Sequence, residues 1–427
     1  MFTSLALAAL VATTSTVSAT KLYVSSYNGN ITTFDFTKSA NASYNLARLD
    51  TTTGCGTSSS WLEIDLKHRN LFCLDENFAS TVNASIASFK ITDEKSAGSL
   101  KKVTNAIVPA APVHSALYDG ANGTQLLAVA HYTHALTTYT VDPQTAKFAL
   151  SQNFNFTMSK PGPKPQQPAP HPHQVVIDPT KKYLIVPDLG ADLVRIYYVD
   201  PTTLQISERP SVTVPPGSGP RHGVFHLTPR AANQRGETHF YLLTEISAMI
   251  LPFNVTYLPN NGGLTFTPIG KSVWAYGSGA NLDPVVASGN APAEIRLAYL
   301  KTGAPQLIVS NRNATFFRDV KNPDPKNSTA IVSDSLATFT LPKLAPGAAT
   351  ANANETQLVT PQALTPAGGL FPRSFALHPN GDMVAVGVQT SERVAIFHRC
   401  VKTGLISKEP VAAFEGLGQV SSLVWGV

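Results

Sequence analysis

Charged residues are scarce in this sequence. Asp, Glu, Lys and Arg make up 14% of the 427 residues, and the formal net charge is only +5. No extended run of Lys or Arg is present, which argues against a nucleic-acid partner. Apolar residues amount to 43% and are spread evenly, so the chain can bury a sizeable core. The composition is therefore that of a globular protein.

Cysteine is also rare, with Cys55, Cys73 and Cys400 the only three. In an oxidising compartment Cys55 and Cys73 can form a disulfide across 18 positions. Cys400 is then an odd thiol, which we expect to be buried. The spacing of the three matches no zinc-binding pattern.

Long apolar runs are missing as well, so no segment is expected to span a membrane, and the C-terminus lacks the tail of a lipid anchor. Residues 1–19 form a short apolar stretch without acid or base that ends in Val17-Ser18-Ala19. This pattern favours a signal peptide with small-residue cleavage over a buried first strand. We expect residues 20–427 to form one domain of a protein that is secreted, extracellular or cell-wall associated.

Sequons for N-glycosylation support the same route, although any single one could be an unmodified surface turn. The chain has nine: Asn30, Asn41, Asn83, Asn122, Asn155, Asn254, Asn313, Asn327 and Asn354. N-glycans are therefore expected partners.

A repeated strand pattern is the main structural signal. An apolar residue, two arbitrary residues and then Phe or Tyr recur seven times, 50 to 58 positions apart except for one gap of 86. The copies are Ile31–Phe34, Ile86–Phe89, Leu136–Tyr139, Val194–Tyr197, Ile250–Phe253, Leu336–Phe339 and Val394–Phe397. Each follows an apolar β-rich run, so each unit is expected to be a small antiparallel sheet.

These units predict an all-β fold, a seven-bladed β-propeller with four-stranded antiparallel blades. The first unit lacks an innermost strand, whereas the chain ends with the unpaired run VSSLVW from Val420. Pairing of the N- and C-terminal strands would close the ring and protect its edges. An ordinary β-sandwich would not predict seven similar units.

Polar residues should converge on one face of such a ring, where the first strand of each blade begins and the second ends. The candidates at the beginnings are His114, His171, His173, Arg221, His222, Glu294 and Arg373, and those at the second-strand ends are Tyr27, Glu76, His131, Asp188, Glu245, Arg312 and Gln389. An arginine-lined funnel of this kind suits an anionic or oxyanion-forming ligand.

The strongest candidates are His173, Arg221, Glu245, Arg312 and Arg373. Four others could bind substrate: His171, His222, Glu76 and Asp188. Asp188 and Glu76 could instead cap turns, and His114 and His131 could be structural.

Four segments carry a family resemblance: HPHQVVIDPTKKYLIVPDLGADLVRIY, GPRHGVF, IVSNR and FPRSFALHPNGDMVAVG. They resemble the seven-bladed β-propeller lactonase family, which groups propeller 6-phosphogluconolactonases with fungal 3-carboxy-cis,cis-muconate lactonising enzymes. The likeness runs from about Lys21 to the end and suggests a secreted fungal type.

The resemblance implies catalytic roles for His173, Glu245, Arg221 and Arg312, places Arg373 on the same face, and implies no metal or organic cofactor. Two segments depart from the family pattern and look inserted, 228–239 and 313–329.

Three functions remain open. A lactone hydrolase would use His173 or Glu245 as base and the arginines as oxyanion donors, acting on a sugar-type lactone outside the cell. A 3-carboxy-cis,cis-muconate cyclase would use the same arginines to bind carboxylates. A secreted or cell-surface glycoprotein could also keep the scaffold without catalysis.

Overall fold

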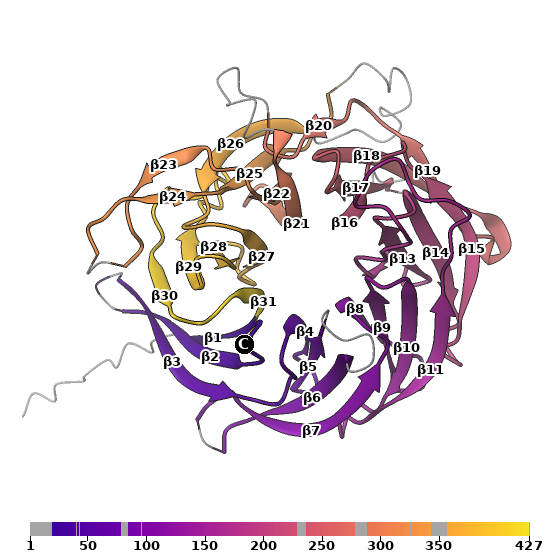
Figure 1. The fold of residues 1–427 in the computed structure, drawn as a ribbon, viewed down its shortest axis with the longest axis horizontal. Helices are drawn as coiled ribbons and strands as arrows, with labels where there is room; N and C mark the ends of the chain where they lie inside the picture. The colour runs from indigo at the N-terminus through magenta and orange to yellow at the C-terminus, as the bar shows by residue number, and fades with distance from the viewer. Residues whose placement is uncertain are drawn as a thin grey trace, which may run out of the picture.

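The computed structural model describes residues 19–39, 41, 43–77, 84–94, 96–228, 236–277, 288–324, 327–342 and 357–426. Its strands form seven antiparallel sheets arranged as blades around one axis (Figure 1). The expected seven-bladed propeller is therefore confirmed. Most of the expected signal peptide, with the sequons at Asn83 and Asn354, lies outside the described residues.

The strands of the first four blades are named from the axis outward. Blade one is β31 (Val420–Trp425), β1 (Ala19–Ser26), β2 (Ile31–Lys38) and β3 (Tyr44–Thr52). Blade two is β4 (Ser59–Asp65), β5 (Asn70–Asp75), β6 (Ala84–Thr92) and β7 (Ser99–Val108). Blade three is β8 (Pro112–Asp119), β9 (Gln125–His131), β10 (Ala135–Val141) and β11 (Phe148–Asn155). Blade four is β12 (Val176–Ile177), β13 (Tyr183–Asp188), β14 (Leu193–Val199) and β15 (Ile206–Thr213).

The other three blades have the same order, with additions. Blade five is β16 (Pro220–Leu227), β17 (Thr238–Thr244), β18 (Met249–Tyr257) and β19 (Leu264–Pro268), joined by β20 (Val273–Trp274) and a 3-10 turn, η1 (Pro259–Asn261). Blade six is β21 (Ala291–Tyr299), β22 (Pro305–Arg312), β25 (Ser335–Thr340) and β26 (Thr360–Pro366). Blade seven is β27 (Pro372–Leu377), β28 (Met383–Val388), β29 (Arg393–His398) and β30 (Ala412–Glu415).

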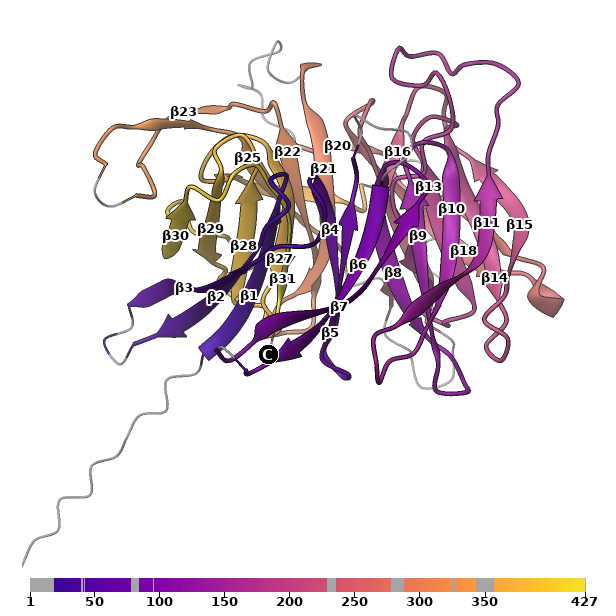
Figure 2. The ribbon, with the colours of Figure 1, turned by 60° about the horizontal axis from the view of Figure 1, so that its bottom comes forward.

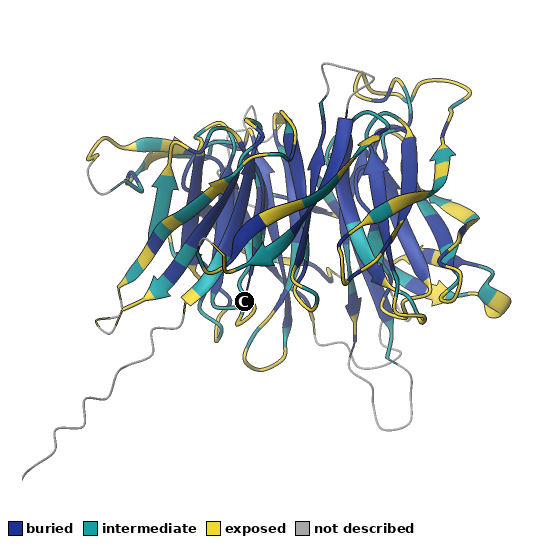
Figure 3. Cartoon of the chain, turned by 90° about the horizontal axis from the view of Figure 1, so that it is seen from below, coloured by how far each residue is buried: buried dark blue, intermediate teal, exposed yellow. Residues whose placement is uncertain are grey.

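The repeated aromatic motif lies in the third strand of every blade. Its side chains are buried and pack between neighbouring blades; Phe253, for example, joins a cluster with Tyr183 and Ile185 of blade four. Figure 3 shows the buried residues along the strands and the exposed ones mainly in the loops at the two faces. Burial of these seven aromatic positions explains why the repeat is visible in the sequence.

Pairing of the chain ends closes the ring. β31 is hydrogen-bonded to β1 with Leu22 opposite Trp425 and Ser25 opposite Ser422, so the last strand supplies the innermost position of blade one. Figure 2 shows β31 beside β1 and β27. The expected closure is confirmed, and β1 is paired on both sides, with β2 and with β31.

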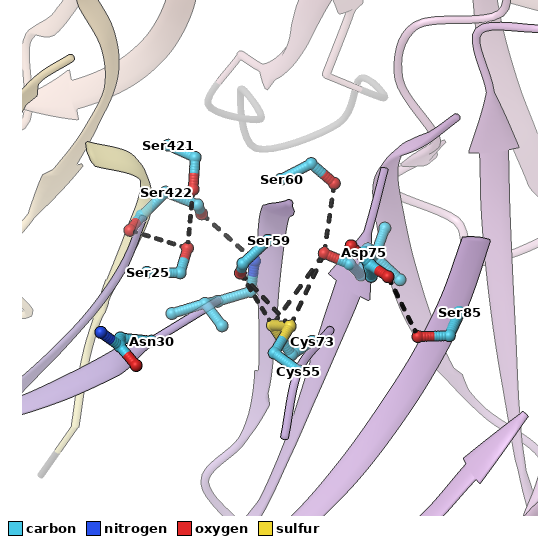
Figure 4. Close-up of a disulfide and its surroundings, with 12 residues drawn as sticks. Ser25, Asn30, Cys55, Ser59, Ser60, Cys73, Asp75, Ser85, Ser421 and Ser422 are labelled. Carbon is cyan, nitrogen blue, oxygen red and sulfur yellow. Dashed lines mark hydrogen bonds between the residues drawn. A yellow bond between two sulfur atoms is a disulfide. The ribbon is translucent and has the colours of Figure 1, made fainter. Parts of the chain in front are cut away.

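A disulfide lies next to this closure. Cys55 and Cys73 are bonded, as expected, and the hydroxyl of Ser59 lies 3.3 Å from Cys55 Sγ (Figure 4). Ser422 of β31 accepts a hydrogen bond from the backbone of Leu62 in blade two at 3.2 Å. Cys400 is a free thiol but is partly exposed, which corrects its expected burial, because it lies in the turn after β29.

The long gap in the repeat is an insertion within blade six. Between β22 and β25 the chain forms a separate two-stranded sheet of β23 (Phe317–Val320) and β24 (Ile331–Ser333). This insertion lies outside the four-stranded blade and leaves its register intact. No helix in the described part of the chain is long and apolar enough to cross a membrane.

Candidate active site

A β-bulge near the start of the innermost strand recurs around the ring. The register against the second strand shifts by a residue between Pro112 and His114, between Pro220 and His222, and equivalently in the other blades. A bulge leaves one residue out of the ladder and can turn its side chain. The residues at this position are Ser60, Val113, His173, Arg221, Ala293, Arg373 and Ser421.

A second position per blade lies beside each bulge. The residue that follows the second strand donates its backbone N–H to the carbonyl two residues before the bulge residue, as Glu245 does to Gly219 at 2.8 Å. In blade six the equivalent pairing is between Arg312 and Ala291. These positions hold Tyr27, Glu76, Tyr132, Leu189, Glu245, Arg312 and Gln389. The two positions bring fourteen side chains to one end of the axis.

Glu245 joins two of the arginines at this end. Its Oε2 lies 2.7 Å from Arg221 Nε and 2.9 Å from Arg312 Nη2. Arg221 also donates to the carbonyl of Ala293, and Arg312 donates to that of Ala291 at 2.9 Å. Both guanidinium groups are thereby fixed in place.

Arg373 forms a second group with blades one and two. Its Nη2 lies 3.4 Å from Glu76 Oε2, which also accepts a hydrogen bond from Tyr27 at 2.9 Å. The guanidinium lies 5.4 Å from the centre of the Tyr27 ring, a cation–π distance. With its side chain 15% exposed, Arg373 is the most accessible of the three arginines, against 2% for Arg221 and 7% for Arg312.

His173 completes the cluster from blade four. Its ring meets Tyr132 edge-on at 5.8 Å and His222 at 5.3 Å. Nδ1 of His173 is buried and has no hydrogen-bond partner among the residues that the structure describes. We call Tyr27, Glu76, Tyr132, His173, Arg221, Glu245, Arg312 and Arg373 the axial cluster; all seven blades contribute to it.

The charges of the axial cluster shift its pKa values. Burial, together with Arg221 and His222, holds the pKa of His173 well below 6.5. Burial and the nearby Arg312 lower the pKa of Arg221 to about 9. Burial alone would raise the pKa of Glu245, but Arg312 and Arg221 outweigh it and lower that pKa. At neutral pH His173 is therefore a neutral imidazole, and Glu245 is a carboxylate held by two arginines.

The other sequence candidates lie outside the axial cluster. Asp188 is fully buried and faces Arg195 at 2.8 Å and the backbone N–H of His171 at 2.7 Å, so its expected substrate-binding role is replaced by a structural one. His171 stacks on Tyr132 at 4.1 Å. His222 lies one residue past the bulge and contacts Glu294 at 3.1 Å.

Tyr132 was missed by the sequence interpretation, which chose His131, the last residue of β9, and not the residue that follows it. His131 is instead buried inside the blade, between the Pro109 carbonyl and Thr137. The sequence signal that could have identified Tyr132 is the Pro that precedes the bulge in several blades. Counted from Pro112, Tyr132 occupies the same blade position as Tyr27 and Glu76.

The described residues hold no group of three or more His, Cys, Asp or Glu that could bind a metal ion. The polar groups of the axial cluster are guanidinium, imidazole, phenol and carboxylate. This set suits recognition of a polarised carbonyl or carboxylate by hydrogen bonds.

Fold and cluster together define a β-propeller with a charged, largely buried cluster at one end of its axis. Comparison with known proteins identifies the class further. The family model described as "Lactonase, 7-bladed beta-propeller" matches residues 21–415. The chain belongs to this family.

Two curated relatives are both named for 6-phosphogluconolactonase. A probable 6-phosphogluconolactonase of Arthroderma benhamiae is 32% identical over 281 residues, 60% of this chain and 66% of that protein. The 6-phosphogluconolactonase of Formosa agariphila is 26% identical over 88% of this chain and 90% of that protein.

Solved structures agree on the fold. The periplasmic gluconolactonase of Pseudomonas aeruginosa superposes with a TM-score of 0.70 at 21% identity, covering 96% of this chain and 99% of that chain. A protein from Lactobacillus plantarum gives a TM-score of 0.68, also at 21% identity, with 96% and 99% covered. At these identities the match establishes the propeller alone.

Proposed function

We propose that this protein is a lactonase that hydrolyses a sugar-type lactone, an aldonolactone, at the axial cluster. The family and the names of both curated relatives support lactone hydrolysis. The observation that carries the proposal is His173, a neutral imidazole whose buried Nδ1 has no hydrogen-bond partner among the described residues and whose pKa is lowered by burial, Arg221 and Arg373.

The charge of the axial cluster favours a substrate of low charge. Its three arginines face the carboxylates Glu76 and Glu245, so with His173 neutral the net charge is about +1 when Glu76 is ionised. A 3-carboxy-cis,cis-muconate would bring three carboxylates to a site that already holds two. An uncharged lactone fits better, since it becomes anionic only in the transition state.

The chemistry requires one water and one proton carrier. His173 Nδ1 accepts a proton from water while the water oxygen bonds to the lactone carbonyl carbon. Arg373, the most accessible arginine, stabilises the oxyanion of the tetrahedral intermediate. Collapse breaks the bond between the carbonyl carbon and the ring oxygen, and the imidazolium returns its proton to that oxygen. The product is an open hydroxy acid.

Glu245 positions arginines in this scheme. Its carboxylate is bound by Arg221 and Arg312, and its lowered pKa makes it a poor proton acceptor. The pair Arg221–Glu245 instead orients the cluster around His173. Glu245 is 25% exposed, so it can also accept a hydrogen bond from a substrate hydroxyl.

We further propose that the protein is secreted and N-glycosylated. Residues 1–19 have the character of a signal peptide, and none of the sequons in the described part of the chain is buried. The acceptors Asn41, Asn122, Asn155, Asn313 and Asn327 are exposed, and Asn30 and Asn254 are half-buried. A sugar lactone outside the cell is the substrate that this location favours.

Acid release from purified protein tests the proposal. Gluconolactone, a disaccharide aldonolactone, 6-phosphogluconolactone and 3-carboxymuconate are compared, the last by ultraviolet absorbance. We expect turnover of the uncharged lactones, with kcat/KM reduced about 100- to 1000-fold in Arg373→Met. His173→Ala should lose about as much as general-base catalysis supplies, roughly 100-fold or more.

Two matched variants serve as controls. His134→Asn and Arg318→Met alter exposed residues outside the cluster and should keep full activity. Turnover of 3-carboxymuconate alone would replace the proposal with the cyclase. No turnover of any compound would leave the non-catalytic glycoprotein as the function.

A further inference from the structure

A second cavity lies on the axis beyond the axial cluster. It has a volume of about 340 Å³ and is lined by the middle of the innermost strands, among them Trp61, His114, Val176, Val224 and Arg296. These residues follow the bulges by one to four positions, so the cavity is further along the strands than the cluster. A volume of this size is in the range of small-molecule sites.

Aromatic rings separate the two sites. His222 meets His173 of the axial cluster at 5.3 Å on one side and His114 at 5.3 Å on the other. His114 in turn stacks on Trp61 at 4.0 Å. A ligand in the second cavity would therefore contact Trp61 and His114 without reaching His173.

Apolar side chains form part of the cavity wall. Alternate residues of a strand share one face. The residues two positions after Trp61, His114 and His222, and those at the same level in the other strands, therefore form the next layer around the axis. In four blades they are Ala116, Val176, Val224 and Val424, all of which line the cavity. The same layer holds two charged residues, Glu63 on β4 and Arg296 on β21.

Arg296 presents unused hydrogen-bond donors to this space. Its Nε lies 3.4 Å from Glu294 Oε1, and no described residue accepts a hydrogen bond from its guanidinium. Its side chain is 39% exposed although it lines the axis. A guanidinium with free donors in a partly apolar cavity is a binding site for a carboxylate.

Glu63 lies in another blade, without an ion pair to Arg296. Its Oε2 accepts a hydrogen bond from Trp61 Nε1 at 3.4 Å. Burial raises the pKa of Glu63 to about 7, so near neutral pH its carboxyl group can donate as well as accept a hydrogen bond. The cavity therefore has the cationic group of Arg296 on one innermost strand and the carboxyl group of Glu63 on another.

We propose that this second cavity binds a small organic acid, with its carboxylate on Arg296, its apolar body against Val176 and Val224, and a hydroxyl group on Glu63. The site is separate from the axial cluster and does not depend on the lactonase activity. It gives the protein a second ligand, bound on the same axis.

Binding of 4-hydroxybutyrate, 5-hydroxyvalerate and 6-hydroxyhexanoate tests this proposal, with hexanoate as the comparison. Trp61 lines the cavity, so we expect a change in tryptophan fluorescence and saturation-transfer signals for at least one hydroxy acid. Arg296→Met should weaken binding roughly tenfold or more. Arg318→Met is the matched control, because Arg318 is exposed on β23.

Hydroxy acids also resemble lactonase products, so Arg373→Met is measured in parallel. The proposal requires that binding survive Arg373→Met and that Arg296→Met leave lactone turnover unchanged. Binding lost in Arg373→Met but kept in Arg296→Met would place the ligand in the axial cluster and overturn the proposal. Absence of binding to wild-type protein would do the same.

A second variant covers the case in which Arg296→Met does not fold. Glu63→Gln keeps the size of the side chain and its hydrogen-bonding ability but cannot titrate. It should bind the best hydroxy acid with an affinity that no longer changes between pH 6 and 8, the range around the Glu63 pKa of about 7. An unchanged pH dependence would contradict the assigned place of Glu63.

Discussion

His173 and Glu245 were equal candidates for the catalytic base, and their surroundings separate them. Two arginines bind the Glu245 carboxylate, whereas Nδ1 of His173 has no partner. The chain order of these residues carries no information on which arginine meets which carboxylate. The sequence could therefore predict which residues belong to the cluster, but not which arginine pairs with which carboxylate.

The pH dependence of activity follows from two residues of the cluster. His173 must be neutral to accept a proton, and its pKa lies well below 6.5, so kcat/KM should fall only well below pH 6.5 on the acid side. Burial lowers the pKa of Arg221, but a guanidinium paired with Glu245 keeps its charge, so activity should not fall through loss of the Arg221 charge at alkaline pH. Acid release, corrected for spontaneous opening of the lactone, measures kcat/KM on both the acid and the alkaline side. An acid limb at pH 6.5 or above would contradict the role of His173.

Asp188 provides a test of the structural role that replaced its expected binding role. Asp188→Asn leaves Arg195 without its buried partner and should lower the free energy of unfolding by about 3 to 5 kcal/mol. Urea unfolding measures this loss. Because Asp188 is fully buried and contacts Arg195 and the backbone of His171, the KM of the folded variant should stay at the wild-type value; a raised KM with unchanged stability would support the binding role.

At the scale of the strand, the sequence predicted the blades well. The third strand of each blade is fully buried around its aromatic residue, so its pattern stands out in all seven units. The bulge of the first strand was not predicted. Five blades mark it with Pro, but β4 and β31 begin with Ser59 and Val420, and a bulge depends on pairing with another strand. His131 was chosen in place of Tyr132 because it is the last residue of the second strand, whereas the cluster position is the residue after it.

The disulfide of blade two should contribute measurably to stability. Closing a loop of 18 residues restricts the unfolded chain and is worth about 3 kcal/mol. The double variant Cys55→Ser/Cys73→Ser should therefore lose about that much unfolding free energy, as measured in urea without reductant. Cys400→Ser is the control, since Cys400 is unpaired and partly exposed. Equal stability of all three proteins would show that the bond constrains nothing.

For the whole ring, the chain ends and the blade interfaces act together. β31 pairs with β1 and contacts blade two through Ser422, so the last strand of the chain joins two blades. The sequence predicted this closure because one unit lacked a strand and the C-terminus had an extra one. It could not predict the second cavity, which depends on the arrangement of six different strands around the axis.

Buried histidines should make the stability of the whole molecule depend on pH. His114, His131, His173 and His222 all have pKa values lowered first by burial, that of His222 to about 4. Below pH 6.5 the unfolded chain binds protons that the folded chain does not, so the free energy of unfolding should rise with pH from about 4 to 6.5.

The size of the expected change in unfolding free energy with pH follows from the groups whose pKa values are shifted. Each such histidine contributes about 1.4 kcal/mol per pH unit, and Glu63, with a pKa raised to about 7, opposes one of them. These five groups together contribute a net slope of about 4 kcal/mol per unit near pH 5.5. Urea unfolding at pH 5, 6 and 7 measures it, and a flat or falling profile would show that these histidines are protonated in the folded protein.

The bulge near the start of each innermost strand also affects how such a propeller can acquire a new chemical activity during evolution. A side chain at that position faces the axis but takes no part in the ladder, so replacing it need not disturb strand pairing. In this chain Ser60, Val113, Ala293 and Ser421 occupy it in the four blades without an ionisable group there. A new acid, base or ligand could arise at each of these four positions by a single substitution. The bulge positions are therefore the part of this molecule at which new chemistry can evolve most readily.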